Sequence, residues 1–288
     1  MPSRGQDESG TTVPRRMTNA RAMAPGLGPD PEWPGWIVFH APHASTHIPL
    51  EVREAFLLDD DDLRQELDRL TDHHADSLLI PEGHIAGAIM PGVSRLVVDV
   101  ERFLDDDQEP MARVGMGAIY TRASDGRPLR GPPTPEAKRA LLDAYYHPHH
   151  ERLTAAVQAA LDTYGRALIL DLHTFPDVPL PCDLDQTPGR PDLCIGTDAF
   201  HTPVELRGRI GEQLAAAGFS VTIDRPYAGT MVPLRHLGRD ERVASVMIEL
   251  NRRLYLDPDG ATARSTAQGI GRQVRECIRS AIVQWVTR

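Results

Sequence analysis

The sequence alternates short apolar runs with long amphipathic stretches, and this alternation constrains the fold more than any other feature. Short apolar runs are typical of strands and the stretches between them of helices, so we expect an α/β sheet flanked by helices. Residues 168–170 and 246–248 are continuously apolar, as in central strands covered on both faces. The runs expected to form strands are residues 36–40, 94–100, 116–120, 167–172, 193–196, 220–224 and 244–250.

Three stretches carry helical periodicity, namely residues 134–164, 204–217 and 262–286. Pro148 is expected to bend or split the first of them. No linker divides residues 31–288, which are predicted to form a single domain. Residues 1–30 are rich in Pro, Gly, Arg and Ser and lack an apolar targeting segment, so they are interpreted as a disordered leader.

Composition excludes several classes of partner. The net charge is -10 and Lys138 is the single lysine, so no basic stripe is available for a nucleic acid backbone. No apolar run approaches the roughly 18 residues that a membrane-spanning helix needs. Three scattered cysteines without paired spacing indicate free thiols, and we expect a cytoplasmic protein.

The twelve histidines are clustered in a way that suggests a metal or acid/base site. His43 follows the apolar run at 37–41, and His173 follows the run at 167–172. The carboxyl ends of strands form the ligand-binding crevice of an open α/β sheet, so both imidazoles are expected to project toward the same place. The alternative is that each histidine is satisfied within a turn.

Three acidic residues could complete such a site. Asp72 and Asp76 are four residues apart and would share one face of a helix, so either is a candidate third ligand, or both face solvent. Glu249 lies inside an apolar strand run, where an ionised carboxylate costs several kcal/mol unless it is paired. It is either half of an ion pair with an arginine or a general base beside a metal-bound water.

Arginines recur in short motifs next to the predicted strands. Arg95, Arg102 and Arg225, the last followed by Tyr227, are candidates for binding a carboxylate or stabilising an oxyanion. They favour a small acidic substrate, whereas surface ion pairing is the alternative. The sequence contains no glycine-rich nucleotide motif and no G-x-S-x-G motif, so covalent acyl transfer has no visible nucleophile.

Several separated motifs, in collinear order from residue 36 to about 258, resemble those of the N-formylglutamate amidohydrolase family. Glu249 falls in a segment similar to the late x-x-E-L strand of the family. The other matching segments are residues 41–49 (APHASTHIP), 70–76 (LTDHHAD), 94–102 (SRLVVDVER), 146–150 (YHPHH), 171–174 (DLHT) and 191–197 (PDLCIGT).

The resemblance implies a zinc-dependent amide hydrolase with a phosphorylase/hydrolase-like, three-layer α/β/α fold around a mixed, mostly parallel sheet, as in the zinc carboxypeptidases. It implies one Zn²⁺ per chain, held by His43, His173 and a carboxylate, with Glu249 as the base. Asp72 is our choice for the carboxylate, because the carboxypeptidase H-x-x-E spacing falls on Thr46. Asp76 and His47 are the alternatives for this ligand.

The chain departs from the family pattern at three places. Ala44-Ser45 replaces S-G after His43, Glu101 replaces the asparagine before Arg102, and His149 replaces a tyrosine. The charge of Glu101 disfavours glutamate as the leaving amino acid. We therefore keep three hypotheses: hydrolysis of N-formyl-L-glutamate or a similar N-acyl amino acid, hydrolysis of another N-acyl amino acid or peptide-derived amide, and metal or ligand binding without catalysis.

Overall fold

The computed structural model describes residues 32–287, and within them five strands form one mixed, mostly parallel sheet of order β1-β2-β5-β3-β4. The strands β1, β2 and β5 are parallel to one another, while β3 runs antiparallel to β5. The strand bounds are β1 (Ile37–His40), β2 (Ala167–Phe175), β3 (Leu193–Gly196), β4 (Val221–Ile223) and β5 (Val243–Asn251).

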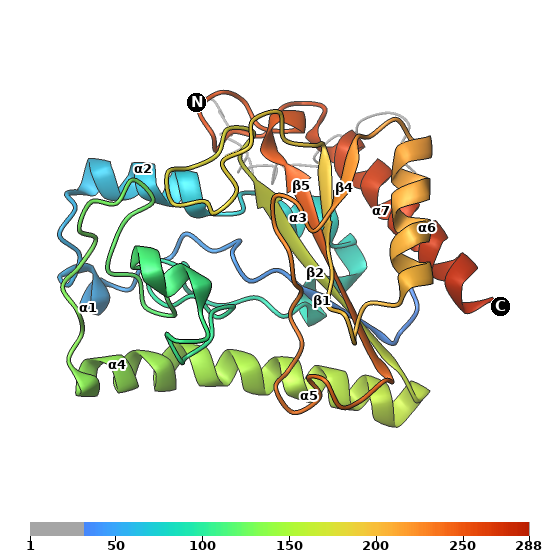
Figure 1. Cartoon of the computed structure of the whole chain (residues 1–288), viewed down its shortest axis with the longest axis horizontal. Helices are drawn as coiled ribbons and strands as arrows, with labels where there is room; N and C mark the ends of the chain where they lie inside the picture. Colours follow the sequence, from blue (N-terminus) through green and yellow to red (C-terminus); the bar gives the residue numbers. More distant parts are fainter. Residues whose placement is uncertain (1–31, 288) are drawn as a thin grey trace, which may run out of the picture. The chain divides into compact units, whose positions relative to one another are not determined.

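Helices cover both faces of this sheet (Figure 1). On one face, Leu168, Leu170 and Leu172 of β2 share a core cluster with side chains of α3, α6 and α7. On the other face, Ala167 and Ile169 pack with side chains of α5. Because successive residues of a strand point to opposite faces, the continuous apolar run in β2 supplies both cores. The three-layer α/β/α architecture is therefore confirmed.

The long helices follow the predicted stretches closely. In Figure 1, α4 and α5 follow one another along the bottom of the view, with α5 beneath the sheet and α4 beyond it, and a π-helical turn at Leu142–Tyr146 separates them. Pro148 lies in the first turn of α5, so the predicted split falls just before the proline. The helix bounds are α1 (Leu50–Arg53), α2 (Asp60–Leu70), α3 (Ala75–Leu79), α4 (Pro135–Leu141), α5 (His147–Tyr164), α6 (Val204–Ala216) and α7 (Ala267–Val286).

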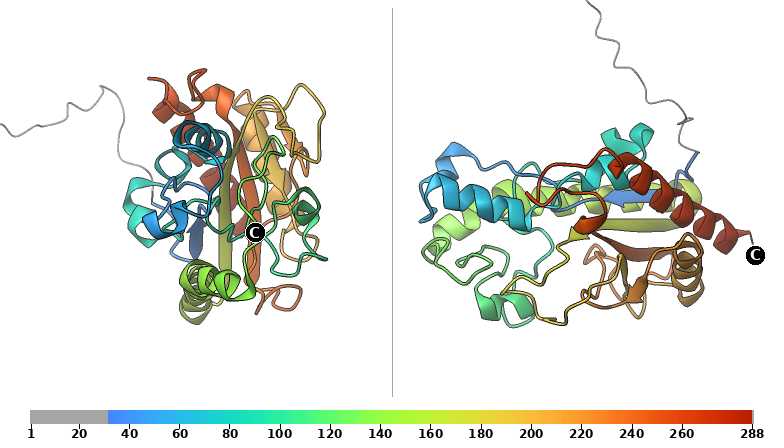
Figure 2. Two further views of the ribbon diagram at one scale, coloured as in Figure 1. Left: turned by 90° about the vertical axis from the view of Figure 1, so that its left-hand side faces the viewer. Right: turned by 90° about the horizontal axis from the view of Figure 1, so that it is seen from above.

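Two of the predicted strands are wrong. Residues 94–100 and 116–120 are buried, apart from the partly exposed Arg95, but they form turns and irregular segments instead of strands. Their apolar side chains, including Leu96, Val98 and Tyr120, pack in a separate hydrophobic cluster with side chains of α1 and α2. The two helices α1 and α2 lie to one side of the sheet (Figure 2). Burial in this cluster needs no strand partner, and burial alone is all that an apolar run can indicate.

The described residues 32–287 form one compact unit. The leader predicted for residues 1–30 lies outside the described residues. Among the helices of residues 32–287, none has the length and apolar character required to cross a bilayer.

Candidate active site

The polar site lies at the carboxyl ends of β1, β2 and β5, on the sheet face that α5 covers. His173 and Glu249 are direct register partners on the parallel strands β2 and β5, so their side chains leave the sheet on the same face. His40 and Asp171 are register partners on β1 and β2. Glu249 and His173 line a cavity of about 1490 Å³, together with His43 and Asp72.

The structure brings His43, His173 and Asp72 together, although they are far apart in the sequence. The two Nδ1 atoms of the imidazoles are 3.2 Å apart, and Asp72 Oδ2 lies 3.2 Å from His173 Nδ1 and 3.8 Å from His43 Nδ1. A backbone hydrogen bond from the N–H of Asp72 to the carbonyl oxygen of His43 (2.9 Å) ties the two segments together. All three side chains are buried.

The opposite nitrogen of each imidazole faces a carboxylate. His43 Nε2 is 2.9 Å from Asp99 Oδ1, and His173 Nε2 is 3.1 Å from Asp171 Oδ1. An ionised carboxylate only accepts hydrogen bonds, so each Nε2 carries a proton, and Nδ1 is the nitrogen of each ring that can bind a metal ion in its deprotonated form. This arrangement is common for metal-binding histidines, whose second nitrogen donates to a carboxylate.

The three facing atoms fit a divalent cation such as Zn²⁺. With zinc–ligand distances near 2.0–2.1 Å, the edge of a tetrahedral site is about 3.3–3.4 Å. The separations among His43 Nδ1, His173 Nδ1 and Asp72 Oδ2 fall around this value. Two imidazole nitrogens and one carboxylate oxygen also form a donor set that zinc accepts, with room for a fourth ligand from the cavity.

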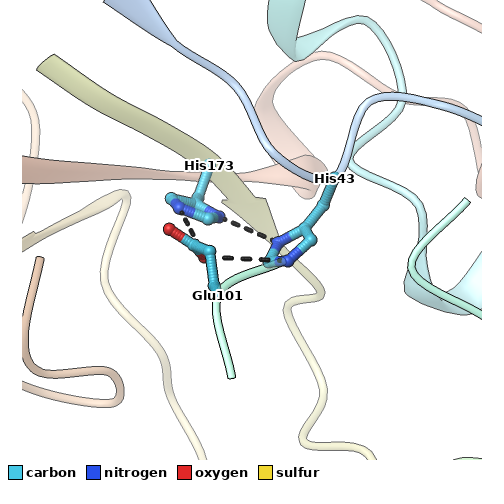
Figure 3. Close-up of side chains that lie close together, drawn as sticks. All are labelled: His43, Glu101 and His173. Carbon is cyan, nitrogen blue, oxygen red and sulfur yellow. Dashed lines mark hydrogen bonds and ion pairs between the residues drawn. The ribbon is translucent and has the colours of Figure 1, made fainter. Parts of the chain in front are cut away.

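Glu101 offers a second carboxylate to the same imidazoles from the Nε2 side (Figure 3). Its Oε2 atom is 3.2 Å from His173 Nε2 and 3.6 Å from His43 Nε2, and these three residues form a second group able to hold a metal ion. Its Oε1 atom is 3.8 Å from His40 Nδ1, and His40, Glu101 and Asp171 form a further such group. The sequence singled out Glu101 only as a charge beside Arg102.

Arginines neutralise two of the buried carboxylates. Arg252 Nη2 donates to Asp72 Oδ1 at 2.9 Å, and Arg95 Nη2 donates to Asp99 Oδ2 at 2.8 Å. Burial alone would raise the pKa of Asp72, but the hydrogen bond and charge of His173 and the charge of Arg252 lower it overall. Arg252 directly follows the last strand, and the sequence analysis did not find it.

Glu249 is buried and its Oε2 atom has no hydrogen-bond partner among the described residues. Burial raises the pKa of Glu249 to about 8, and the negative charges of Asp72 and Glu101 act in the same direction against the opposing charges of His173 and Arg252. The sequence offered an ion pair with an arginine as one of two roles for Glu249. Among residues 32–287, Glu249 forms no such ion pair. A carboxyl group that lines a cavity without a hydrogen-bond partner and titrates near neutral pH has the properties of a general acid or base.

Some of the candidate substrate-binding residues line the cavity and one does not. Arg95, Arg102 and Tyr227 line the cavity, whereas Arg225 is not among its lining residues. The Arg225 side chain is 67% exposed and pairs with Asp185 Oδ2 at 3.2 Å. Arg102 Nε lies 3.5 Å from Asp99 Oδ2.

Tyr227 is held within the cavity wall. Its hydroxyl accepts a hydrogen bond from Arg190 Nη1 at 2.9 Å and donates to Asp183 Oδ1 at 3.2 Å. Burial raises its pKa, so it remains a neutral phenol. It therefore contributes a fixed polar wall.

The two alternative ligands lie apart from the imidazole pair. His47 is exposed and lines a separate, smaller pocket. Asp76 accepts a hydrogen bond from the backbone of Ser77 (2.7 Å). The expectation that Asp72 and Asp76 share a helix face is wrong, because His74 has a left-handed φ of 63° and α3 begins only at Ala75.

Comparison with known proteins identifies the family. A profile of the family described as N-formylglutamate amidohydrolase matches residues 36–256, so the chain belongs to this family. Proteins named in this way are hydrolases that act on amide C–N bonds. An N-formylglutamate deformylase of Pseudomonas putida is similar, with 25% identity over 229 residues that cover 77% of this chain and 82% of the relative.

Solved structures share the fold. The N-formylglutamate amidohydrolase from Ralstonia eutropha JMP134 superposes with a TM-score of 0.73 at 23% identity, covering 88% of this chain and 94% of that one. A gene product from Agrobacterium tumefaciens superposes with a TM-score of 0.65 at 20% identity, covering 87% and 92%.

Proposed function

We propose that this protein is a zinc-dependent amide hydrolase that cleaves N-formyl-L-glutamate, or a similar N-acyl amino acid, by attack of a metal-activated water. The observation that carries the proposal is the facing pair of imidazole Nδ1 atoms with Asp72 beside them and the unpartnered Glu249 in the same cavity. The name of the Pseudomonas putida relative supports the substrate. The free thiols of Cys182, Cys194 and Cys277 support a reducing, cytoplasmic location.

His43, His173 and Asp72 would hold a single Zn²⁺. When bound, the ion supplies a Lewis acid that polarises the scissile carbonyl and lowers the pKa of water toward about 7. Asp99 and Asp171 keep the protons of the two imidazoles on Nε2 and so present the Nδ1 lone pairs to the ion. Arg252 holds the other oxygen of Asp72 in place.

Glu249 would act as the general base and then as the general acid. It accepts a proton from the attacking water as the new C–O bond forms, and it returns that proton to the departing amine nitrogen as the C–N bond breaks. The products are formate and the free amino acid. Arg95, which lines the cavity, would stabilise the negative charge that develops on the carbonyl oxygen, and Arg102 would attract a substrate carboxylate.

The proposal is tested by measuring zinc content and formate release from N-formyl-L-glutamate with the purified protein. Glu249→Gln is expected to lower kcat by about 10²–10⁴-fold, as for loss of a general base, while the zinc content is unchanged. Glu241→Gln, which alters an exposed glutamate outside the cavity lining, is the matched control and should leave kcat unchanged. Turnover of the zinc-loaded protein that is unaffected by Glu249→Gln would exclude Glu249 as the general base, and zinc-loaded protein that releases no formate would favour a metal-binding protein without catalysis.

Glu101 favours a second candidate, a metallohydrolase for a different N-acyl amino acid or a peptide-derived amide. Its carboxylate lines the cavity, and its charged partners among the described residues are imidazoles, so it adds negative charge that disfavours the side-chain carboxylate of glutamate. A panel of N-formyl and N-acyl amino acids separates the two candidates. Formate release from N-formyl-L-glutamate faster than from every other member would exclude the second.

A further inference from the structure

The arginines that line the cavity differ in what they contact. Arg95 pairs with Asp99 at 2.8 Å, and Arg252 pairs with Asp72 at 2.9 Å. Arg69 and Arg102 also have carboxylate neighbours. Arg69 Nη1 is 3.4 Å from Glu66. Arg102 Nε is 3.5 Å from Asp99 and 3.9 Å from Glu109. Each of these four guanidinium groups is thus already opposed by a carboxylate of the protein.

Arg235 is the fifth arginine of the cavity lining, and it is different. Its side chain is exposed, and no hydrogen bond or ion pair links it to another of the residues 32–287. A guanidinium group offers five N–H donors in a planar fork that matches a carboxylate. An uncommitted fork at the edge of a cavity is therefore available to an anionic ligand.

Apolar side chains accompany Arg235 around the cavity. Phe103, Leu184 and Leu234 are 43%, 68% and 61% exposed, and all three belong to the cavity lining. Leu234 directly precedes Arg235. Exposed apolar groups in the lining of a concave site can contact an apolar part of a ligand.

The inner part of the cavity carries negative charge that no arginine offsets. Asp171 and Glu101 both line the cavity, and their charged neighbours among the described residues are the imidazoles of His40, His43 and His173. The positive charge of a single Zn²⁺ at the proposed site would offset part of the negative charge of these carboxylates. A second substrate carboxylate placed here would still meet like charges at close range, which disfavours it.

We infer that Arg235 binds the carboxylate of the substrate in place of Arg102, which already faces Asp99 and Glu109, and that the substrate is an N-acyl amino acid with one carboxylate and an apolar side chain. This inference rests on the proposed function and narrows its substrate class. The carboxylate would pair with the guanidinium group of Arg235, while the apolar side chain would lie against Phe103, Leu184 or Leu234. N-formyl-L-leucine belongs to this class, whereas N-formyl-L-glutamate carries a second carboxylate for which the cavity offers no free arginine.

The test compares two substrates in two variants of the zinc-loaded protein. Arg235→Gln is expected to raise KM for N-formyl-L-leucine about tenfold or more, which is typical for loss of a charge-assisted hydrogen bond. The same variant should leave KM for N-formyl-L-leucinamide, which lacks the carboxylate, unchanged, and kcat should be unchanged for both. Arg235→Lys should restore part of the lost affinity because it keeps the charge but not the fork.

Arg239→Gln is the matched control, because Arg239 is also exposed and lies four residues along the same segment but does not line the cavity. Equal effects of Arg235→Gln on the acid and the amide, or no effect on either, would overturn the role of Arg235. A wild-type kcat/KM higher for N-formyl-L-glutamate than for N-formyl-L-leucine would overturn the apolar substrate class. If no amide of the panel is hydrolysed at all, the proposed function itself fails, which is a separate outcome.

Discussion

At the scale of single residues, the imidazoles of His43 and His173 lie between two groups of carboxylates. Their Nδ1 atoms face Asp72, and their Nε2 atoms face Asp99, Asp171 and Glu101. A carboxylate that accepts a hydrogen bond from Nε2–H stabilises the tautomer in which Nδ1 is free. The hydrogen bonds to Asp99 and Asp171 therefore favour a metal on the side of Asp72 over one on the side of Glu101.

This preference predicts different effects of two matched substitutions on zinc affinity. Asp72→Asn removes an anionic ligand and should weaken zinc binding by more than the 10–100-fold that loss of an outer partner typically causes. Glu101→Gln should change zinc affinity by less than that range. Competition with a chromophoric chelator measures both constants, and thermal unfolding checks that Asp72→Asn, which also loses its partner Arg252, remains folded. The reverse order of the two effects would assign the metal to Glu101.

The sequence predicted the members of this site unevenly. His43, His173 and Glu249 were found because each stands at or within an apolar strand run, where a polar side chain requires an explanation. Asp99 and Arg252 lie in segments whose conformation depends on tertiary contacts, and their partners are 56 and 180 residues away in the chain. Sequence spacing carries no information about such partners.

At the scale of elements, the sheet strands and the segment at 94–100 show what an apolar run can predict. The runs that form β2 and β5 are flanked by helices on both faces, so their burial coincides with strand pairing. Residues 94–100 are as deeply buried, but they form turns, with Val97 N–H donating to the carbonyl of Ser94 at 2.9 Å. Hydrophobicity reports burial in both cases, and only the availability of a neighbouring strand distinguishes them.

The contact of α7 with α3 depends on a glycine. A Cβ atom at Gly271 of α7 would lie 2.5 Å from the carbonyl oxygen of Leu78 in α3, and that oxygen also accepts a hydrogen bond from Arg275. Gly271→Ala is therefore expected to lower the free energy of unfolding by about 1–3 kcal/mol, since backbone must move to admit the methyl group. Urea unfolding followed by circular dichroism measures the change.

Gly269, two residues earlier on α7, provides the control for this prediction. It is exposed and a Cβ atom there would meet nothing within 4 Å. Gly269→Ala should raise the free energy of unfolding by about 0.5–1 kcal/mol, because alanine is the better helix former. Equal effects of the two substitutions would show that helix propensity, not the close approach to α3, decides the stability at Gly271.

At the scale of the whole molecule, buried histidines couple folding to pH. Burial lowers the pKa of His149 to about 2, and it also lowers those of His43, His73 and His150. His173 is different, because the charges of Glu101 and Asp171 hold its pKa well above the usual 6.5 in spite of its burial. The two kinds of histidine therefore change the free energy of unfolding in different pH ranges.

The sign of each contribution follows from which state binds more protons. His173 binds its proton more tightly in the folded state, so its contribution is fully present below pH 6.5 and is lost as the pH rises through its folded pKa. The histidines with lowered pKa bind protons more tightly when unfolded. Their contribution is present above pH 6.5 and is lost as the pH falls below that value.

Between about pH 6 and pH 4, His173 is protonated in both states and the histidines with lowered pKa dominate the slope among these groups. The free energy of unfolding of the metal-free protein is therefore expected to fall with decreasing pH, by up to about 1.4 kcal/mol per pH unit for each such histidine. His149→Gln removes one titrating group but keeps an amide N–H that can donate to His40 Nε2, the atom 2.9 Å from His149 Nε2. Urea unfolding in chelator at half-unit pH intervals should give a slope for His149→Gln shallower by about one proton. Identical slopes would contradict the lowered pKa, because they would show that His149 binds its proton equally well in the folded and unfolded states.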